Sequence, residues 1–542
     1  MTVASTPEPA ADFERFASEA VDQLLAYQPS LATAIGDHRF DDRLEDLRPA
    51  AVNDEIRALR AVLTRLERYP LDRLPVGHRV DAEILRNKVA ERLFELETLR
   101  EHEWNPLQAN PGTALYLLLA RDFAPLDDRL RALAGRLAAV PEQLAAARAS
   151  SRDMPRVHVE TAIDQFSGTL RLLEDEIPAH AQGSPYAGLV AERLAPAVEA
   201  VRTHLAWLCE QLDQADGDPR LGPELYTAKL ALVLDVARRP EDVAAAAWAE
   251  VQRVEQAMVE TAGRLGGSPQ EIFARLAEQA PNDETVITEA RSALAEATEF
   301  VQGRELVTYY ADPLDIIVMP EIHRGVAVAY CEPPGPLDPP DTPTFFAISP
   351  APASWPSERV ASFYREYNVH ALRNLVVHEA MPGHMLQLAH ARRSETPTLV
   401  RRAFWSGPFV EGWAVYAEEV MARYGFGGLA VAMQQLKMRL RTALNAVLDV
   451  GVHCEGLTEE EALRLLRDRG YQEEGEAVGK WRRALLTSAQ LSTYHVGVLE
   501  VSEVAAQLRA AHPEWSDRRL HDTLLSFGNP PPRHLPRLLG LA

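Results

Sequence analysis

Cysteine is scarce in this sequence of 542 residues, which contains only Cys209, Cys331 and Cys454. No two of them are close in sequence, which excludes a disulfide framework and a zinc knuckle of cysteines and fits a reducing compartment. No apolar run approaches the roughly 20 residues that a membrane helix needs. The N-terminal stretch MTVASTPEPAADFERF lacks the basic and apolar regions of a secretory signal. We therefore expect a cytoplasmic protein without a membrane partner.

Basic residues are too few to balance the acidic ones. The sequence has 56 Lys and Arg against 79 Asp and Glu, a net charge of −23. Such a surface repels phosphate backbones and acidic lipids, and no basic stripe offsets it, so nucleic acid is excluded as a partner. The content of 46% hydrophobic and 25% charged residues is that of a globular protein. The oligomeric state stays open at this stage.

Helical texture dominates the chain, with one interruption. Residues 1–300 are rich in Ala, Leu, Arg and Glu at helical spacing and predict a helical N-terminal lobe. Residues 301–360 contain the β-branched runs LDIIVMP, GVAVAYC and TFFAIS, followed or surrounded by nine prolines between Pro333 and Pro356, and predict short strands with a proline-rich loop. Residues 361–542 predict a second helical lobe. The expected fold is mainly α, with two lobes around a deep cleft and a small inserted β-sheet.

A candidate metal motif lies in the segment RNLVVHEAMPGHMLQ, which contains His378, Glu379 and His384. Zinc prefers imidazole nitrogen and carboxylate oxygen, and a catalytic site combines three protein ligands with water. In the familiar HExxH pattern the two histidines are four apart on one helical face, and the glutamate acts as general base. We expect His378 and His384 to be ligands of Zn²⁺ and Glu379 to be the base.

The spacing of six between the histidines departs from that pattern. On an undistorted helix their rings would lie roughly 120° apart around the axis and about 9 Å apart along it, too far for one zinc ion. Pro382 and Gly383 directly precede His384, and these two residue types are the best able to break a helix. The sequence therefore predicts a looped-out or bulged turn that absorbs two extra residues and returns His384 to the second-ligand position. The nearby His370 and His390 are interpreted as surface or supporting residues.

The third ligand is expected from the helix FVEGWAVYAEEVMARYG. Its Glu411 and Glu418 are seven apart and share one face, whereas Glu419 is expected in solvent. We predict Glu411 as the ligand, because Gly412 beside it permits close approach of the histidine helix. Glu418 is then placed to hold a ligand imidazole.

A last polar group occurs in the segment SAQLSTYHVGVLE, where Gln490, Tyr494 and Gly497 share a helical face. A tyrosine hydroxyl can donate to the oxyanion of a tetrahedral intermediate. We interpret Tyr494 as a catalytic residue and Gln490 as a supporting one, with ordinary core packing as the alternative.

Together these motifs resemble a bacterial family described as domain of unknown function 885. The resemblance runs from PSLATAIGDHRFDDRLEDL through HEAMPGH, EGWAVYAEE and LDVGVH to the Gln490–Gly497 segment, so that one family domain covers about residues 12–541. It implies a zinc metalloprotein similar to helical peptidases, with His378, His384 and Glu411 as ligands and Glu379 as base. The family usually has Pro-Gly-Gln where this chain has Ser-Ala-Gln at 488–490.

Three functions follow as hypotheses. The first is a zinc peptidase that cleaves short peptides by metal-activated water. The second keeps the metal but acts on a small amide or ester of specialised metabolism. The third is a metal-stabilised scaffold without turnover, which would have a closed site.

Overall fold

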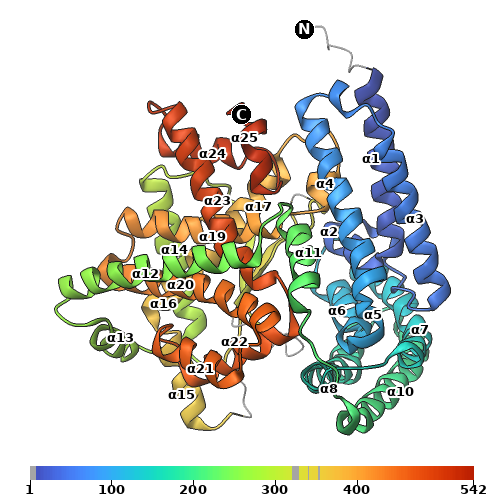
Figure 1. Ribbon diagram of the computed structural model, residues 1–542. Helices are drawn as coiled ribbons and strands as arrows, with labels where there is room; N and C mark the ends of the chain where they lie inside the picture. The colour runs from blue at the N-terminus through green and yellow to red at the C-terminus, as the bar shows by residue number, and fades with distance from the viewer. Residues whose placement is uncertain (1–7, 320–328, 340, 352–354, 542) are drawn as a thin grey trace.

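The computed structural model describes residues 8–319, 329–339, 341–351 and 355–541 (Figure 1). The first half of the chain forms the helices α1 (Glu8–Tyr27), α2 (Pro29–Ile35), α3 (Pro49–Glu67), α4 (Val76–Leu93), α5 (Glu101–Trp104), α6 (Gly112–Ala120), α7 (Leu126–Ser150), α8 (Arg156–Arg171), α9 (Ile177–Ala181), α10 (Ala187–Gln211), α11 (Gly222–Leu234), α12 (Pro240–Arg264), α13 (Pro269–Ala277) and α14 (Val286–Gly303).

The second half forms the helices α15 (Ser357–Glu366), α16 (Val369–Glu379), α17 (His384–Arg393), α18 (Val400–Ala403), α19 (Gly407–Arg423), α20 (Gly428–Val450), α21 (Glu459–Asp468), α22 (Glu474–Leu486), α23 (Gln490–Ala511), α24 (Asp517–Leu524) and α25 (Leu535–Leu538). Local signals explain several boundaries. Thr458 forms a capping box with Glu461 at the start of α21, and the Ser406 side chain caps α19. No helix among the described residues is both long and apolar enough to span a bilayer.

The inserted sheet has three strands, β1 (Leu314–Val318), β2 (Ala329–Glu332) and β3 (Thr344–Ile348), in the order β1-β3-β2. β1 pairs parallel with β3, in a register that sets Leu314 opposite Thr344, and β2 pairs antiparallel with β3. The predicted strand GVAVAYC lies partly outside the described residues, and its described end belongs to β2. A mainly α fold with a small inserted sheet is thus confirmed.

The sheet lies against the helix that carries the metal motif. Ile316 and Phe346 are buried in one hydrophobic cluster with Ala290 of α14 and Val376 of α16. β2 reaches the same region. Burial raises the pKa of the Cys331 thiol on β2, and the charge of Glu379 on α16 raises it further. The sheet therefore supports α16 from behind.

The helices gather in two groups that do not divide at residue 300 (Figure 1). In α12, Val254 and Met258 share a core with Leu440 and Leu444 of α20, and α14 packs on α16. Helices α12 to α14 therefore belong with the second half, whereas α1 to α10 form the other group. The packing thus crosses residue 300, which the sequence did not indicate because an amphipathic helix shows its apolar face but not the partner of that face.

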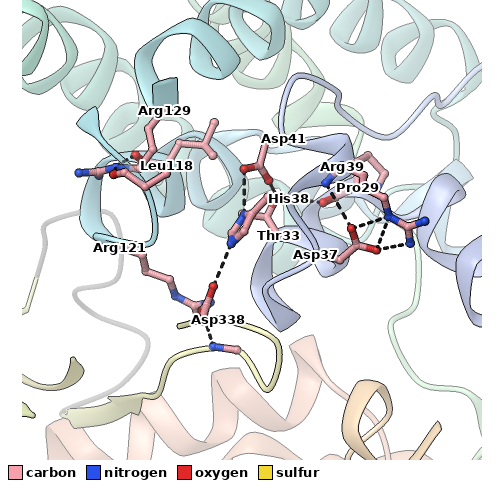
Figure 2. A network of polar contacts seen from close by, with 12 residues as sticks. Pro29, Thr33, Asp37, His38, Arg39, Asp41, Leu118, Arg121, Arg129 and Asp338 are labelled. Atoms are coloured by element: carbon pink, nitrogen blue, oxygen red, sulfur yellow. Dashed lines mark hydrogen bonds and ion pairs between the residues drawn. The ribbon is translucent and has the colours of Figure 1, made fainter. Parts of the chain in front are cut away.

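A buried polar network joins the N-terminal helices to the proline-rich loop (Figure 2). The His38 ring stands between two carboxylates, 2.9 Å from Asp41 through Nδ1 and 2.9 Å from Asp338 through Nε2. It stacks on Phe123 at 3.6 Å between ring centroids. The side chain of Asp338 is fully buried and also accepts a hydrogen bond from the amide of Gly335 at 2.6 Å.

Burial alone would lower the pKa of His38, but hydrogen bonds to Asp338 and Asp41 outweigh it and raise that pKa to about 9. The charged imidazole therefore links residues 300 positions apart in the chain. Beside it, Arg121 pairs with Glu332 at the end of β2, which ties the same helices to the sheet. The segment 29–47, part of the family resemblance, thus serves to fix the loop and sheet behind the candidate site.

Replacing His38 by glutamine is expected to remove a pH-dependent part of the stability. Because folding raises the pKa of His38 from about 6.5 to about 9, its contribution is fully present below about pH 6.5 and is lost as the pH rises through 9. The free energy of unfolding should differ between wild type and His38→Gln by about 2–3 kcal/mol more at pH 6 than at pH 10. Urea unfolding at both pH values measures this.

The same substitution at the exposed His180, which bonds only to its own helix, is the control and should leave the pH profile unchanged. A difference between wild type and His38→Gln that is constant with pH would contradict the assignment.

Candidate metal centre

The motif is a looped-out break between two helices, one of the two forms expected, and not a bulge within one helix. α16 ends at Glu379, α17 begins at His384, and the peptide bond between Met381 and Pro382 is cis. Across the break the amide of Gly383 donates to the carbonyl of Val377 at 2.9 Å. The new helix therefore starts directly beside the last turn of the old one.

Glycine at position 383 is required by this close approach. A Cβ atom there would lie 1.8 Å from the carbonyl oxygen of His378, so no other residue fits without moving the backbone. The Nε1–H of Trp413 donates to the carbonyl of Pro382 at 2.9 Å and fixes the turn from α19. As a result the rings of His378 and His384 lie 4.7 Å apart between centroids, at 84° to each other.

Glu411 on α19 completes a three-residue cluster with these histidines. Its Oε2 lies 3.5 Å from the Nε2 of His378 and 3.5 Å from the Nε2 of His384. Among the described residues these three offer ligand atoms that all lie within 4.8 Å of one another. Two ligands about 2.05 Å from a zinc ion at a tetrahedral angle are about 3.3 Å apart, so the spacing fits zinc.

The surroundings of the Glu411 Oε2 atom also fit a bound cation. Its Oε2 is sealed from solvent and has no hydrogen-bond partner among the described residues. Burial would raise the pKa of Glu411, but the interactions with His378 and His384 outweigh it and hold that pKa far below its usual range. The carboxylate is therefore charged, and its buried charge needs a positive partner at this point.

Glu418 holds the first histidine from the far side. Its Oε1 lies 2.7 Å from the Nδ1 of His378, and its Oε2 accepts a hydrogen bond from the Asn374 amide at 2.6 Å. Burial lowers the pKa of His378, but Glu411 and Glu418 raise it well above its ordinary value. If a metal displaces the proton on Nε2, the proton that Glu418 holds on Nδ1 leaves the Nε2 lone pair facing Glu411 and His384. The two carboxylates thus occupy different sides of one imidazole.

The position of Glu411 depends on a contact between α19 and α23. A Cβ on Gly412 would meet the backbone of Gly497 at 2.4 Å, and a Cβ on Gly497 would meet the carbonyl of Pro408 at 2.1 Å. The expectation that Gly412 admits the histidine helix was therefore wrong: it admits α23. Glu411 is the fifth residue of α19.

This contact brings Tyr494 beside the cluster. Tyr494 is partly buried, and burial together with the charge of Glu411 raises its pKa above the usual range, so the hydroxyl stays protonated. Arg483 on α22 donates through Nη2 to the Tyr494 hydroxyl at 3.2 Å and to Gln490 Oε1 at 3.0 Å. The phenol oxygen therefore accepts a hydrogen bond and keeps its own proton for another acceptor.

The turn before Gln490 forms in this chain with Ser488 and Ala489 in place of Pro-Gly. Ala489 has φ +64°, a left-handed conformation in which glycine, the family's usual residue, is less strained. Asp449 stabilises the turn by accepting hydrogen bonds from the amides of Ala489 and Ser492 at 3.2 and 3.0 Å. The start of α23, and with it the placement of Tyr494, is thus preserved without Pro-Gly.

The remaining candidates lie elsewhere. His390 is buried, not at the surface, and its Nε2 lies 2.9 Å from the carbonyl of Thr308. His370 is half-buried at the start of α16, two turns from His378. Sequence reasoning missed Asn374, which its spacing of four from His378 could have indicated. It also missed Arg483, for which the sequence carries no signal.

A cavity of about 500 Å³ opens beside the cluster. The residues that line it include Glu411, Gln490 and Trp405, together with Glu101 and Lys229 from the first half of the chain. The cavity therefore lies where the two groups of helices face each other, next to one side of the metal cluster.

Comparisons with known proteins identify relatives along the whole chain. Residues 29–539 match the family model described as bacterial protein of unknown function, DUF885. A solved structure described as "a putative lipoprotein of unknown function from Shewanella oneidensis" is 28% identical and covers 97% of this chain and 99% of its own, with a TM-score of 0.80. Among curated proteins none matches the sequence.

A second solved structure, described as "the putative lipoprotein from Colwellia psychrerythraea", is 16% identical, covers 99% of both chains and has a TM-score of 0.82. At that identity it shows the fold alone. Neither description names an activity. Both descriptions call the neighbour a putative lipoprotein, so the cytoplasmic location expected from the sequence stays a prediction.

The protein is expected to bind about one zinc ion per chain, and Glu411→Ala should abolish tight binding because it removes a ligand. Glu418→Ala should weaken the affinity by about 10- to 100-fold, because it frees the ring of His378 without removing a ligand. His390→Ala is the control and should bind zinc as wild type does. The measurement is zinc retained after dialysis against a graded series of chelators.

A reversed order of the two glutamates would exchange their roles. Equal, mild losses would mean that the third ligand lies outside α19.

Proposed function

We propose that this chain, which belongs to the DUF885 family of bacterial proteins of unknown function, is a zinc-dependent hydrolase of the peptidase type. The observation that carries the proposal is the buried Oε2 of Glu411, which has no hydrogen-bond partner among the described residues and lies 3.5 Å from both histidine Nε2 atoms. His378, His384 and Glu411 would hold the metal. Zinc in such a site polarises a carbonyl group and makes water a competent nucleophile near neutral pH.

Glu379 is the expected general base. It follows His378 at the end of α16 and is buried, yet its carboxylate forms no hydrogen bond with the described residues. Such a carboxylate can accept the proton of an attacking water and transfer it to the leaving amine. The charge of Glu379 contributes to the raised pKa of His378, which supports a position of this carboxylate close to the proposed ligands.

Tyr494 is the expected donor to the developing oxyanion. Its pKa is raised, so the hydroxyl carries a proton, and Arg483 occupies the acceptor side of its oxygen. A donor held in this way is oriented before the reaction begins, which is the arrangement that stabilises a tetrahedral intermediate. The cavity beside Glu411 supports turnover, since a purely structural metal site would be closed.

Glu379→Gln should keep its zinc and lose hydrolysis by about 10² to 10⁴-fold, because the amide keeps the size of the side chain but cannot act as a base. The measurement is digestion of a mixed peptide library, with and without a chelator, followed by mass spectrometry. Unchanged activity in this variant would exclude Glu379 as the base. A zinc-loaded wild type that leaves every peptide intact would reject the peptidase and direct attention to other amides or esters.

Tyr494→Phe should lower kcat by about 10² to 10³-fold while the zinc content and the fold stay unchanged, because a transition-state hydrogen bond is lost but no ligand is. Steady-state kinetics on a cleaved peptide, together with elemental analysis, measure both quantities. Wild-type kinetics would return Tyr494 to a packing role in the core formed by α19 and α23.

A further inference from the structure

A cluster of cationic side chains on α20 and α22 lies next to the candidate metal site. Lys480 and Arg483 on α22 are three residues apart and therefore share one helical face. Arg483 reaches Tyr494 at 3.2 Å, so the cluster is one hydrogen bond away from the proposed oxyanion donor. Lys437 and Arg441 of α20 lie behind this face and are buried.

The carboxylates in the cluster already have hydrogen-bond or ion-pair partners. Glu366 binds Lys437 at 3.0 Å and Arg441 at 3.1 Å. Glu476 pairs with Arg441 and accepts the hydroxyl of Tyr367 at 3.1 Å. The next carboxylate, Glu473, is bound by Ser362 and Arg365.

Lys480 is consequently short of a partner. Its amine forms no hydrogen bond with the described residues, and its ion pair with Glu476 is long, at 4.0 Å. The side chain is only 12% exposed, so water does little to solvate the charge. Burial lowers the pKa of Lys480 to about 7, although Glu476 acts in the opposite direction. A buried amine in this state gains from any anion that approaches it.

Arg483 has spare donors as well. Both of its hydrogen bonds, to Tyr494 and Gln490, use Nη2, and no described residue accepts from Nε or Nη1. The four cations Lys437, Arg441, Lys480 and Arg483 face the carboxylates Glu366 and Glu476, and the charge of Glu411 also acts on Arg483. Lys480 and Arg483 are therefore the two cations whose nitrogens keep donors for a further acceptor.

We propose that Lys480 and Arg483 bind the terminal carboxylate of the substrate, so that the protein acts on peptides with a free C-terminus. This inference rests on the proposed hydrolase function and adds the substrate class. The chemistry fits because a carboxylate accepts charge-assisted hydrogen bonds from both an ammonium and a guanidinium group. The carboxylate would occupy the face of α22 that leads from Lys480 to Tyr494, with the scissile bond toward the metal.

The test uses two libraries of N-acetylated five-residue peptides without Asp or Glu, one ending in a free carboxylate and the other in a carboxamide. Zinc-loaded wild type should cleave the free acids about 10- to 100-fold faster. Lys480→Met should raise KM for the acids by a similar factor, leave kcat nearly unchanged and leave the amides unaffected. Lys480→Arg should recover most of the acid preference, because it restores a cationic donor.

Arg482→Met is the matched control. It removes a positive charge from the neighbouring position on α22, but Arg482 faces away and donates to Thr161 of α8 at 3.0 Å. It should retain the full preference for acids. Equal cleavage of the two libraries by wild type, or equal losses on both libraries in Lys480→Met, would overturn the assignment.

A binding measurement separates this inference from the proposed activity. Glu379→Gln protein is incubated with both libraries and the retained peptides are identified by ultrafiltration and mass spectrometry. Enrichment of free acids that disappears with an added Lys480→Met substitution supports the carboxylate site even if no peptide is cleaved. Retention without preference for acids overturns it, whether or not the wild type hydrolyses peptides.

Discussion

The buried carboxylate of Glu411 is the constraint on which the rest of the site depends. An ionised oxygen without a hydrogen-bond partner is costly in a protein interior unless a positive charge lies next to it. Two imidazoles converge on that oxygen at equal distances, and the chain must break a helix at Gly383 to bring the second one there. A hydrogen bond from Trp413 holds the break in place, and the contact between Gly412 and Gly497 sets how closely α19 approaches α23. Each of these features is explained by the need to gather positive charge, protons or a metal ion, around Glu411.

The parts of this arrangement that the sequence predicts are local ones. A proline and a glycine directly before His384 require a departure from the helix, whatever the rest of the chain does. Ser406 and Thr458 carry their capping function in their own side chains and those of near neighbours. The difference between Glu411 and Glu418 also follows from spacing, since seven residues separate them by about 10 Å along one helical face. Of the two forms that the sequence allowed, a loop or a bulge, the chain adopts the loop between two helices.

The parts that it does not predict are contacts between distant segments. Gly412 indicates that another helix approaches closely, but no neighbouring residue in the sequence identifies α23 as that helix. Arg483 lies 72 positions from Glu411 and becomes relevant only because α22 packs beside α23, where its guanidinium meets Tyr494. The packing of α12 and α14 across residue 300 was not predicted for the same reason, since both helices have ordinary apolar faces that would suit either group of helices. An amphipathic pattern specifies that a face is buried, and packing specifies against what.

The distribution of charge connects the metal centre with the cation cluster. The protein as a whole carries −23, so its outer field repels anions rather than drawing them in. A carboxylate would therefore be recognised only at short range, after it has entered the space between the helices, where low polarity strengthens each contact. Such a design favours small ligands that can reach α22 over large acidic surfaces that cannot. The two sites also make opposite demands, a cation at Glu411 and an anion at Lys480, and a zinc ion with a peptide carboxylate would meet both.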